Sequence, residues 1–206
     1  MTNLYDRWIL PVLLDACCGM KVVQDQRARL VPRARGRVLE VGIGTGRNLP
    51  FYDRARLTSL EGLDPATEMN PKAEQRAKAA GLDVRIVTLS AETIPAADAT
   101  YDTVVCTFTL CSIPDAVKAL HEMRRVLKPG GELLFCEHGR SPDPAVSRWQ
   151  DRLTPWWKPL AGGCHLNRDV RTMLSDGGFR PTEIESQYLK GPKPILYVTR
   201  GVAVAG

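Results

Sequence analysis

The chain has 206 residues, of which 44% are apolar, and a formal net charge of +5. This length suits one domain with a sizeable core, and no apolar run approaches the roughly 20 residues that cross a bilayer. We also expect no signal peptide, because a basic start, an apolar core and a small-residue cleavage site are absent at the N-terminus. The six cysteines form no C-x-x-C pair, which favours reduced thiols and a cytoplasmic protein.

The positive charge is concentrated in one segment. Residues 21–56 hold nine Lys or Arg against three Asp or Glu, a net +6, so the rest of the chain sums to about −1. Such a segment could make peripheral contact with an anionic membrane, or it could be a solvated helix face. No basic stripe interleaved with aromatic residues is present, so we expect no nucleic-acid partner.

Residues 1–31 are expected to form an N-terminal helical cap of one or two helices. Trp8 and Val12 belong to an apolar pattern at helical spacing, and Pro11 bends or divides the run. An amphipathic helix here would lie over the carboxyl edge of the sheet, with Tyr5 facing inward. The alternative is a packing helix with no chemical role.

Residues 37–48 are the most informative stretch of the chain. An apolar run from Val38 to Val41 suits a strand that is buried on both faces. Glu40 lies near its carboxyl end, where open α/β sheets bind ligands. Glycines then follow at alternate positions, in a turn that lets the backbone approach a ligand, with the N–H groups of the next helix facing it. These glycines are Gly42, Gly44 and Gly46.

The dinucleotide-binding fingerprint competes with this interpretation and fails on spacing. It requires Gly or Ala at position 47, where this chain has Arg47. Asp64 follows the second predicted strand, 22 residues beyond Gly42, an offset typical of an acid that binds ribose hydroxyls. Asp64 could also be a helix N-cap, and a tight strand-to-helix turn with no cofactor is the other alternative.

The remaining chain alternates strands with helices, which predicts a parallel, doubly wound sheet closed by an antiparallel pair. A helical insertion or lid over residues 140–166 interrupts the alternation. Its Trp149, Trp156 and Trp157 could line an apolar pocket or pin the insertion to the sheet. The expected strands are 57–63, 83–89, 101–108, 132–136 and two within 179–202; the expected helices are 72–80, one opened by Pro114, and one ending at Leu174.

Several stretches resemble, in order and spacing, the motifs of class I S-adenosylmethionine-dependent methyltransferases. These are Glu40-Val-Gly-Ile-Gly-Thr-Gly46, Gly62-Leu-Asp64, Val104 to Ser112, and Arg125 to Gly131. Three more stretches resemble bacterial relatives of the small methyltransferase-like thiol S-methyltransferases and, more distantly, quinone and phosphatidylethanolamine methyltransferases. They are Cys106 to Ser112, Phe135 to His138, and Gly163 to Arg168.

The resemblance implies a single α/β methyltransferase domain over residues 1–206. Its fold would be a Rossmann-like, doubly wound, seven-stranded sheet, mostly parallel with an antiparallel C-terminal strand. The cofactor would be S-adenosyl-L-methionine, released as S-adenosyl-L-homocysteine, with an acid meeting its charged amino end. The implied cofactor contacts are Glu40, Gly42, Gly44, Gly46, Asn48, Asp64, Ala91, Glu92, Thr107 and Cys111.

Methyl transfer is an in-line displacement at a sulfonium carbon, so the protein mainly positions the reactants and excludes water. A thiol acceptor reacts as its thiolate, and His138 and His165 are the candidate bases, with Tyr5 as a further catalytic candidate. Each histidine could instead be structural. Cys136, His138, Cys164 and His165 are metal-type ligands, but adjacent ligands at 164–165 do not match closed zinc spacing, so no metal is predicted.

Three functions remain open. The first is methyl transfer to a small thiol, and the second is transfer to a phospholipid amine or a quinone. The third is a protein that binds S-adenosylmethionine without catalysis. The partner in the first two is a small-molecule acceptor, a thiol or a lipid amine, which the sequence does not name.

Overall fold

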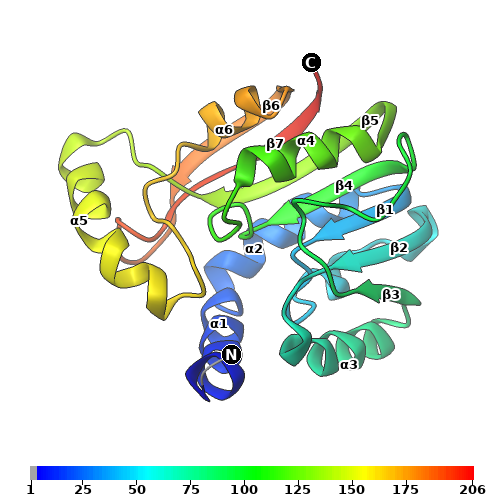
Figure 1. Cartoon of the computed structure of the whole chain (residues 1–206), viewed down its shortest axis with the longest axis horizontal. Helices are drawn as coiled ribbons and strands as arrows, with labels where there is room; N and C mark the ends of the chain where they lie inside the picture. Colours follow the sequence, from blue (N-terminus) through cyan, green and yellow to red (C-terminus); the bar gives the residue numbers. More distant parts are fainter. Residues whose placement is uncertain (1–3) are drawn as a thin grey trace.

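One seven-stranded sheet organises the chain in this computed structural model, which describes residues 4–206 (Figure 1). The strand order is β3-β2-β1-β4-β5-β7-β6, and only β7 runs antiparallel to its neighbours. The predicted seven-stranded sheet with its antiparallel C-terminal strand is therefore confirmed. The strands are β1 (Gly36–Val41), β2 (Leu57–Leu63), β3 (Val84–Val87), β4 (Tyr101–Thr107), β5 (Leu127–His138), β6 (Phe179–Tyr188) and β7 (Tyr197–Ala205).

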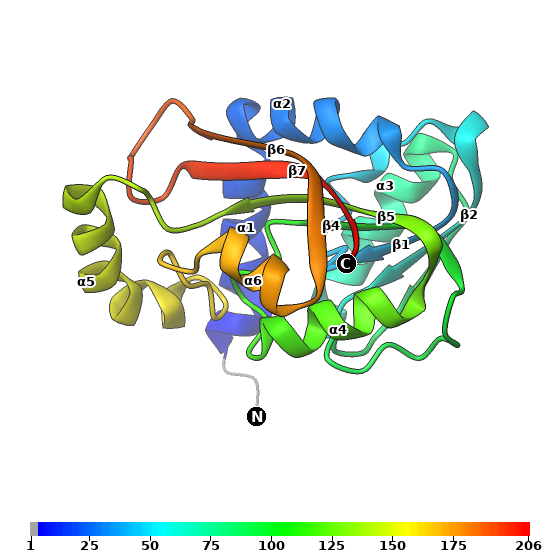
Figure 2. The ribbon, with the colours of Figure 1, turned by 90° about the horizontal axis from the view of Figure 1, so that it is seen from above.

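Helices cover both faces of the sheet, as a parallel arrangement requires (Figure 2). α2 and α3 lie on one face, while α4 and α6 lie on the other. Each face has its own apolar core, because successive strand residues point to opposite sides. Val104 faces the α4 core, and its neighbour Val105 faces the α2 core. The helices are α2 (Lys21–Leu30), α3 (Asn70–Ala80), α4 (Ala116–Val126) and α6 (Val170–Asp176).

Two helical segments extend beyond the carboxyl edge of the sheet (Figure 1). One comprises a π-helical turn η1 (Tyr5–Ile9) and α1 (Leu10–Cys18). The other is α5 (Pro144–Leu160), within the predicted insertion, which projects from one end of the molecule. Among residues 4–206, no helix combines the length and the apolar character that crossing a membrane requires.

Most element boundaries follow the sequence signals. β2 spans the predicted 57–63, and α3 ends where Gly81 adopts a left-handed conformation. α3 begins at Asn70, earlier than predicted, because Pro71 is tolerated in its first turn. α4 begins at Ala116 rather than at Pro114, since the Asp115 carboxylate accepts the hydrogen bond that caps this helix.

The turn after β1 differs from the prediction. No α-helix follows the glycines; the chain makes only a short 3₁₀ turn, η3 (Leu49–Phe51), before Tyr52 becomes extended. Pro50 lies in the first turn of η3, where proline is tolerated, and the turn ends because the backbone of Tyr52 is extended. The N–H groups expected from a helix N-terminus are therefore absent from this place, and side chains surround the site instead. Two further 3₁₀ turns are η4 (Arg54–Arg56) and η5 (Thr67–Met69), and η2 (Val31–Arg33) follows α2.

The basic segment 21–56 is not a free cationic surface. Acids from other parts of the fold neutralise it: Arg33 pairs with Glu183, and Arg37 pairs with Glu61. Arg27 is buried, with only 5% of its surface exposed. The partners are distant in sequence, and they offset part of the charge excess of the segment. Contact of this segment with an anionic membrane stays a prediction.

Candidate cofactor and acceptor site

A cavity of about 300 Å³ opens at the carboxyl edge of β1, β2 and β4. Open α/β sheets place their ligands at this edge. Its walls come from the glycine turn, from the loops after β2, β3 and β4, and from α1, whose Leu10 and Leu14 cover it. The described chain therefore brings the predicted motifs together around one space. The predicted residues that line it are Gly42, Gly44, Asp64, Ala91 and Thr107.

The three glycines of the turn all have positive φ, but their surroundings differ. Gly46 does not line the cavity, and a Cβ there would lie 2.7 Å from the Leu49 side chain. A Cβ on Gly42 would lie 2.2 Å from the Thr109 side chain, so this glycine lets the β1 and β4 loops touch. A Cβ on Gly44 would meet nothing closer than 3.6 Å, because this residue faces the cavity. Gly44 is thus the position where backbone is exposed to a ligand.

Asp64 is held at the end of β2 with its carboxylate toward the glycine turn. Its two oxygens accept hydrogen bonds from the Gly44 N–H (2.9 Å) and the Ala66 N–H (2.9 Å). Burial raises the pKa of this carboxyl, although the two hydrogen bonds favour its ionised form and oppose the rise. Each oxygen keeps a further lone pair for a hydroxyl donor, as a ribose would supply.

Glu40 lies behind the cavity wall, fully buried at the end of β1. Its oxygens accept hydrogen bonds from Asn48 Nδ2 (3.0 Å) and the Tyr52 hydroxyl (2.8 Å). Burial raises the pKa of Glu40 to about 7, although Tyr52, Arg27 and Asn48 favour its ionised form. This carboxyl is therefore poised to respond to a positive charge brought into the cavity.

Arg27 of α2 lines the cavity and was not predicted from the sequence. Its Nη1 donates to Asn48 Oδ1 and to the Thr107 hydroxyl, both at 2.6 Å. Its Nε is buried and has no hydrogen-bond partner among residues 4–206. A buried donor without a partner is costly unless a ligand satisfies it, and a guanidinium suits a carboxylate. Helical periodicity placed Arg27 in a basic helix but gave no signal that it turns inward.

Asp15 of α1 is a second residue that the sequence did not reveal. Its carboxylate accepts hydrogen bonds from Thr45, Arg47 and Arg76, with Oδ1 at 2.6, 2.8 and 2.8 Å from them. Burial alone would raise the pKa of Asp15, but these bonds outweigh it and hold the pKa well below its usual value. Asp15 therefore fastens α1 to the glycine turn and to α3, over the cavity.

The segment after β3 contributes differently from the prediction. Ser90 and Ala91 line the cavity, whereas Glu92 does not. The Glu92 carboxylate instead accepts hydrogen bonds from the Ser90 hydroxyl (2.9 Å) and the Asp115 N–H (2.7 Å). Glu92 thus connects the β3 loop to the start of α4.

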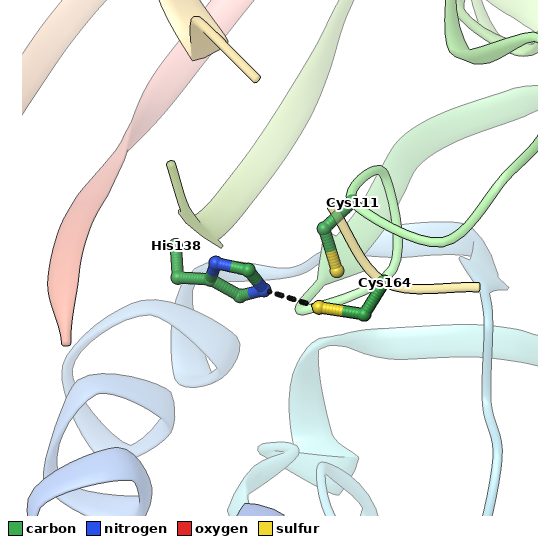
Figure 3. A group of neighbouring side chains, drawn as sticks. All are labelled: Cys111, His138 and Cys164. Carbon is green, nitrogen blue, oxygen red and sulfur yellow. Dashed lines mark hydrogen bonds between the residues drawn. The ribbon is translucent and has the colours of Figure 1, made fainter. Parts of the chain in front are cut away.

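Three side chains that are far apart in sequence meet beside the cavity: Cys111 from the loop after β4, His138 from the end of β5, and Cys164 from the loop after α5 (Figure 3). All are buried, and none of the three lines the cavity itself. Cys164 lowers the pKa of Cys111 well below its usual value, and the same pairing raises the pKa of Cys164. Burial alone would lower the pKa of His138, but Cys111 raises it.

The other two predicted catalytic residues lie at the edge of this region. His165 is half-buried, and its Nδ1 lies 3.0 Å from the Cys111 carbonyl oxygen. The Tyr5 hydroxyl donates to the Leu160 carbonyl oxygen at 2.6 Å, which joins η1 to the end of α5. Neither residue lines the cavity. Their catalytic roles stay predictions.

Comparison with known proteins places this geometry in a family. Residues 39–135 match a family model described as a methyltransferase domain. The chain is 33% identical to thiol S-methyltransferase TMT1B of Rattus norvegicus over 171 residues, which are 82% of this chain and 68% of the relative. The chain belongs to the class I S-adenosylmethionine-dependent methyltransferases.

Two further relatives show the breadth of this methyltransferase family. Phosphatidylethanolamine N-methyltransferase of Cereibacter sphaeroides is 33% identical over 65% of this chain and 66% of its own length. A putative methyltransferase of Haloferax volcanii, solved with its Trm112 activator, shares the fold with a TM-score of 0.71 at 18% identity, covering 100% of this chain and 99% of that one. The methyltransferase fold is thus constant while the named substrates differ.

S-adenosylmethionine is the cofactor of this methyltransferase, and the residues present fit it. Arg27, the carboxylate of Asp64 and the open backbone of Gly44 line the cavity and supply a cation, a hydroxyl acceptor and a close approach. When bound, the cofactor supplies an electrophilic methyl group on a sulfonium, together with its leaving group. The protein binds, orients and shields the reactants.

Proposed function

We propose that this methyltransferase transfers a methyl group to the sulfur of a small, largely apolar thiol. The observation that carries the proposal is the composition of the cavity on the side away from Asp64. Leu10, Leu14 and Cys18 of α1 line the cavity there with Ser112 and Gly162, and the α1 carboxylate that also lines it, Asp15, is already bonded to Thr45, Arg47 and Arg76. A neutral, apolar acceptor fits such a lining better than a cationic one. The thiol S-methyltransferase relative supports the same choice.

In this proposal the cofactor lies between the glycine turn and the loop after β4. Arg27 binds the carboxylate of the cofactor. Glu40 attracts the amino group of the cofactor from behind Asn48, to which Glu40 is hydrogen-bonded. Asp64 binds the ribose hydroxyls, and Ala91 borders the adenine. Thr107 orients Arg27 through their 2.6 Å hydrogen bond. The acceptor then enters beneath α1, where the apolar lining excludes water from the reacting atoms.

A thiol acceptor has to lose its proton, because the thiolate is the nucleophile. The group formed by Cys111, His138 and Cys164 stands directly behind Ser112 and Gly162 of the cavity wall. We assign activation of the acceptor to this group. His165 supports it by binding the Cys111 carbonyl, and Tyr5 supports the cap by binding the end of α5.

The test is transfer of labelled methyl from S-adenosylmethionine to a panel of small alkyl and aryl thiols by the purified protein. We expect turnover on apolar thiols, loss of turnover in His138→Ala with cofactor binding retained, and loss of both in Asp64→Ala. Binding of S-adenosylmethionine with no transfer to any thiol would contradict the proposal and favour a non-catalytic cofactor-binding protein.

A second candidate function is methylation of a lipid amine at a membrane surface. It is favoured by apolar side chains on η1, α1 and α5, including Trp8 (64% exposed) and Trp156 (77% exposed). Exposed tryptophans beside cations suit the headgroup region, and Arg7 lies over Trp8, 5.3 Å from the ring centroid. This candidate predicts transfer to phosphatidylethanolamine in vesicles, with less transfer in Trp8→Ser and Trp156→Ser.

A further inference from the structure

We infer that Cys111, His138 and Cys164 form a zinc site on the acceptor side of the cavity. Two thiols and an imidazole are ligands that zinc prefers, and the ligand atoms of all three residues lie within 4.8 Å of one another. In a tetrahedral zinc site such atoms are roughly 3.4–3.8 Å apart. The side chains therefore need only small adjustments to share one ion. The inference deepens the proposed function and rests on it for the role of the ion.

The side chains converge on one point rather than pairing outward. Figure 3 shows the Nε2 atom of His138 directed at the sulfur of Cys164, 3.0 Å away, with the sulfur of Cys111 beside them. The other ring nitrogen, Nδ1, is buried and has no hydrogen-bond partner among the described residues. Nε2 therefore makes the single hydrogen bond of this imidazole among the described residues, to the Cys164 thiol, and a metal ion that replaced the thiol proton would take the lone pair of that nitrogen.

The backbone that carries Cys111 is held in place from several sides. The N–H groups of Thr109 and Leu110 donate to the buried Glu137 carboxylate at 2.9 and 3.1 Å. The His165 N–H donates to the Cys111 carbonyl at 2.9 Å, which binds the Cys164 turn to the Cys111 loop. Ligands fixed in this way before binding lose little conformational freedom when an ion arrives.

Donors to the sulfurs complete the arrangement. The indole N–H of Trp157 donates to Cys164 Sγ at 3.2 Å, and the Ser112 hydroxyl lies 3.5 Å from Cys111 Sγ. Such bonds stabilise thiolates, the form in which cysteine binds metal. Two thiolates also balance the charge of Zn²⁺ in a region where Glu137 is already buried.

The three zinc ligands differ from the ligand set that was considered from the sequence. The sequence offered Cys136, His138, Cys164 and His165, in which two ligands are adjacent. In the fold, Cys136 lies in the core beneath α2, and His165 lies against the Cys111 carbonyl oxygen, so neither is a ligand. Cys111 is the third ligand instead. With three protein ligands, the fourth position belongs to a small molecule, as in catalytic zinc sites. An acceptor thiol bound there would lose its proton to solvent and react as a thiolate.

The test is a titration of the reduced, metal-free protein with Co²⁺, a spectroscopic substitute for zinc, in a phosphine reductant. We expect saturation at one equivalent, a thiolate-to-cobalt charge-transfer band, and displacement of cobalt by Zn²⁺. Cys111→Ser and Cys164→Ser should each weaken binding by at least about 100-fold. Cys17→Ser, which changes an exposed cysteine, should leave the titration unchanged.

A wild-type protein that develops no charge-transfer band would overturn the zinc site without any variant. A band that persists unchanged in a Cys111→Ser, Cys164→Ser double variant would overturn it equally. S-adenosylmethionine binding and thiol turnover are measured separately on the same samples. Failure of the metal site is thereby distinguished from failure of the proposed function.

Discussion

Nη1 of Arg27 lies 2.6 Å from Oδ1 of Asn48, so the second N-terminal helix is bonded to the turn after β1. Arg27 belongs to none of the sequence motifs, whereas Asn48 lies within the glycine-containing stretch 37–48. It places a buried cation at the cavity wall, next to the carboxylate of Glu40, which also receives a bond from Asn48 (3.0 Å). Arg27 thus lines the cavity as a cation, while the carboxyl of Glu40 lies behind the cavity wall.

Replacing Arg27 with Gln is expected to weaken binding of S-adenosylhomocysteine by about 10–100-fold, since a charge-assisted hydrogen bond contributes roughly 1.5–3 kcal/mol. Binding of 5′-methylthioadenosine, which lacks the amino acid group, should change little. Isothermal titration of both ligands measures the difference. Arg29→Gln, an exposed residue of the same helix, is the matched control. Equal losses for both ligands would show that Arg27 supports the fold rather than the carboxylate.

Glu40 predicts a pH dependence of cofactor binding. Its pKa is raised to about 7, so the carboxyl is mostly protonated at pH 6 and mostly ionised at pH 8. An ammonium group binds better to the ionised form, and affinity should rise by about tenfold across this range. Titration of S-adenosylhomocysteine at several pH values tests this. Glu40→Gln should bind weakly with a flat profile near pH 7; an unchanged slope in that variant would exclude Glu40 as the cause.

The same raised pKa predicts an opposite effect on stability. A carboxyl that binds its proton more tightly when folded contributes stability below pH 4.5, and this contribution is lost as the pH rises through about 7. The loss is on the order of 3 kcal/mol. Urea unfolding of the ligand-free protein should therefore show a larger decline between pH 5 and pH 7.5 for the wild type than for Glu40→Gln.

The glycine turn offers a matched pair of substitutions. Gly44→Ala places a methyl group in the cavity at φ +51°, so we expect a stability loss of about 1–2 kcal/mol and a strong loss of cofactor binding. Gly42→Ala forces its Cβ into Thr109 and should cost about 2–4 kcal/mol. Thermal melts with and without S-adenosylmethionine separate the two effects. A Gly44→Ala protein that is still stabilised by the cofactor as strongly as wild type contradicts the account.

Asp15 links α1 to the glycine turn and α3, so we expect its replacement to destabilise the fold. Asp15→Asn leaves Arg47 and Arg76 without their shared carboxylate, and we expect a loss of about 1–3 kcal/mol in unfolding free energy. Because its pKa is held below the usual value, the wild-type contribution is present above pH 3.8 and lost as the pH falls further. Lys72→Ala should cost less than about 0.5 kcal/mol, as its bond to Asp15 is long (3.5 Å) and half-exposed.

The sequence predicted the sheet well because its signals are local. Glycine ended α3, an apolar run marked β1, and the Asp64 offset followed from the length of one β-turn-β unit. The short helix expected after the glycines is only one 3₁₀ turn, η3, because the backbone becomes extended at Tyr52. Patterns of neighbouring residues determine elements of this kind, and they were accessible without coordinates.

The site was less predictable because it depends on long-range convergence. Cys111, His138 and Cys164 come from three loops, and no spacing rule connects them. Arg27 and Asp15 belong to helices whose periodicity shows which face is apolar but not which charge turns inward. The surroundings of the basic segment depend on distant residues in the same way, since Glu61, Glu132 and Glu183 of other strands pair with three of its arginines.

The most direct test of the central claim is a competition in one reaction. Purified protein receives labelled S-adenosylmethionine, an apolar alkyl thiol, and phosphatidylethanolamine in vesicles with anionic lipid, and mass spectrometry identifies the methylated product. The account predicts a methyl thioether as the main product, at the same rate with or without vesicles. Label that appears on the lipid amine, with the thiol unmodified, would contradict the account and assign the apolar surface of η1, α1 and α5 to membrane binding.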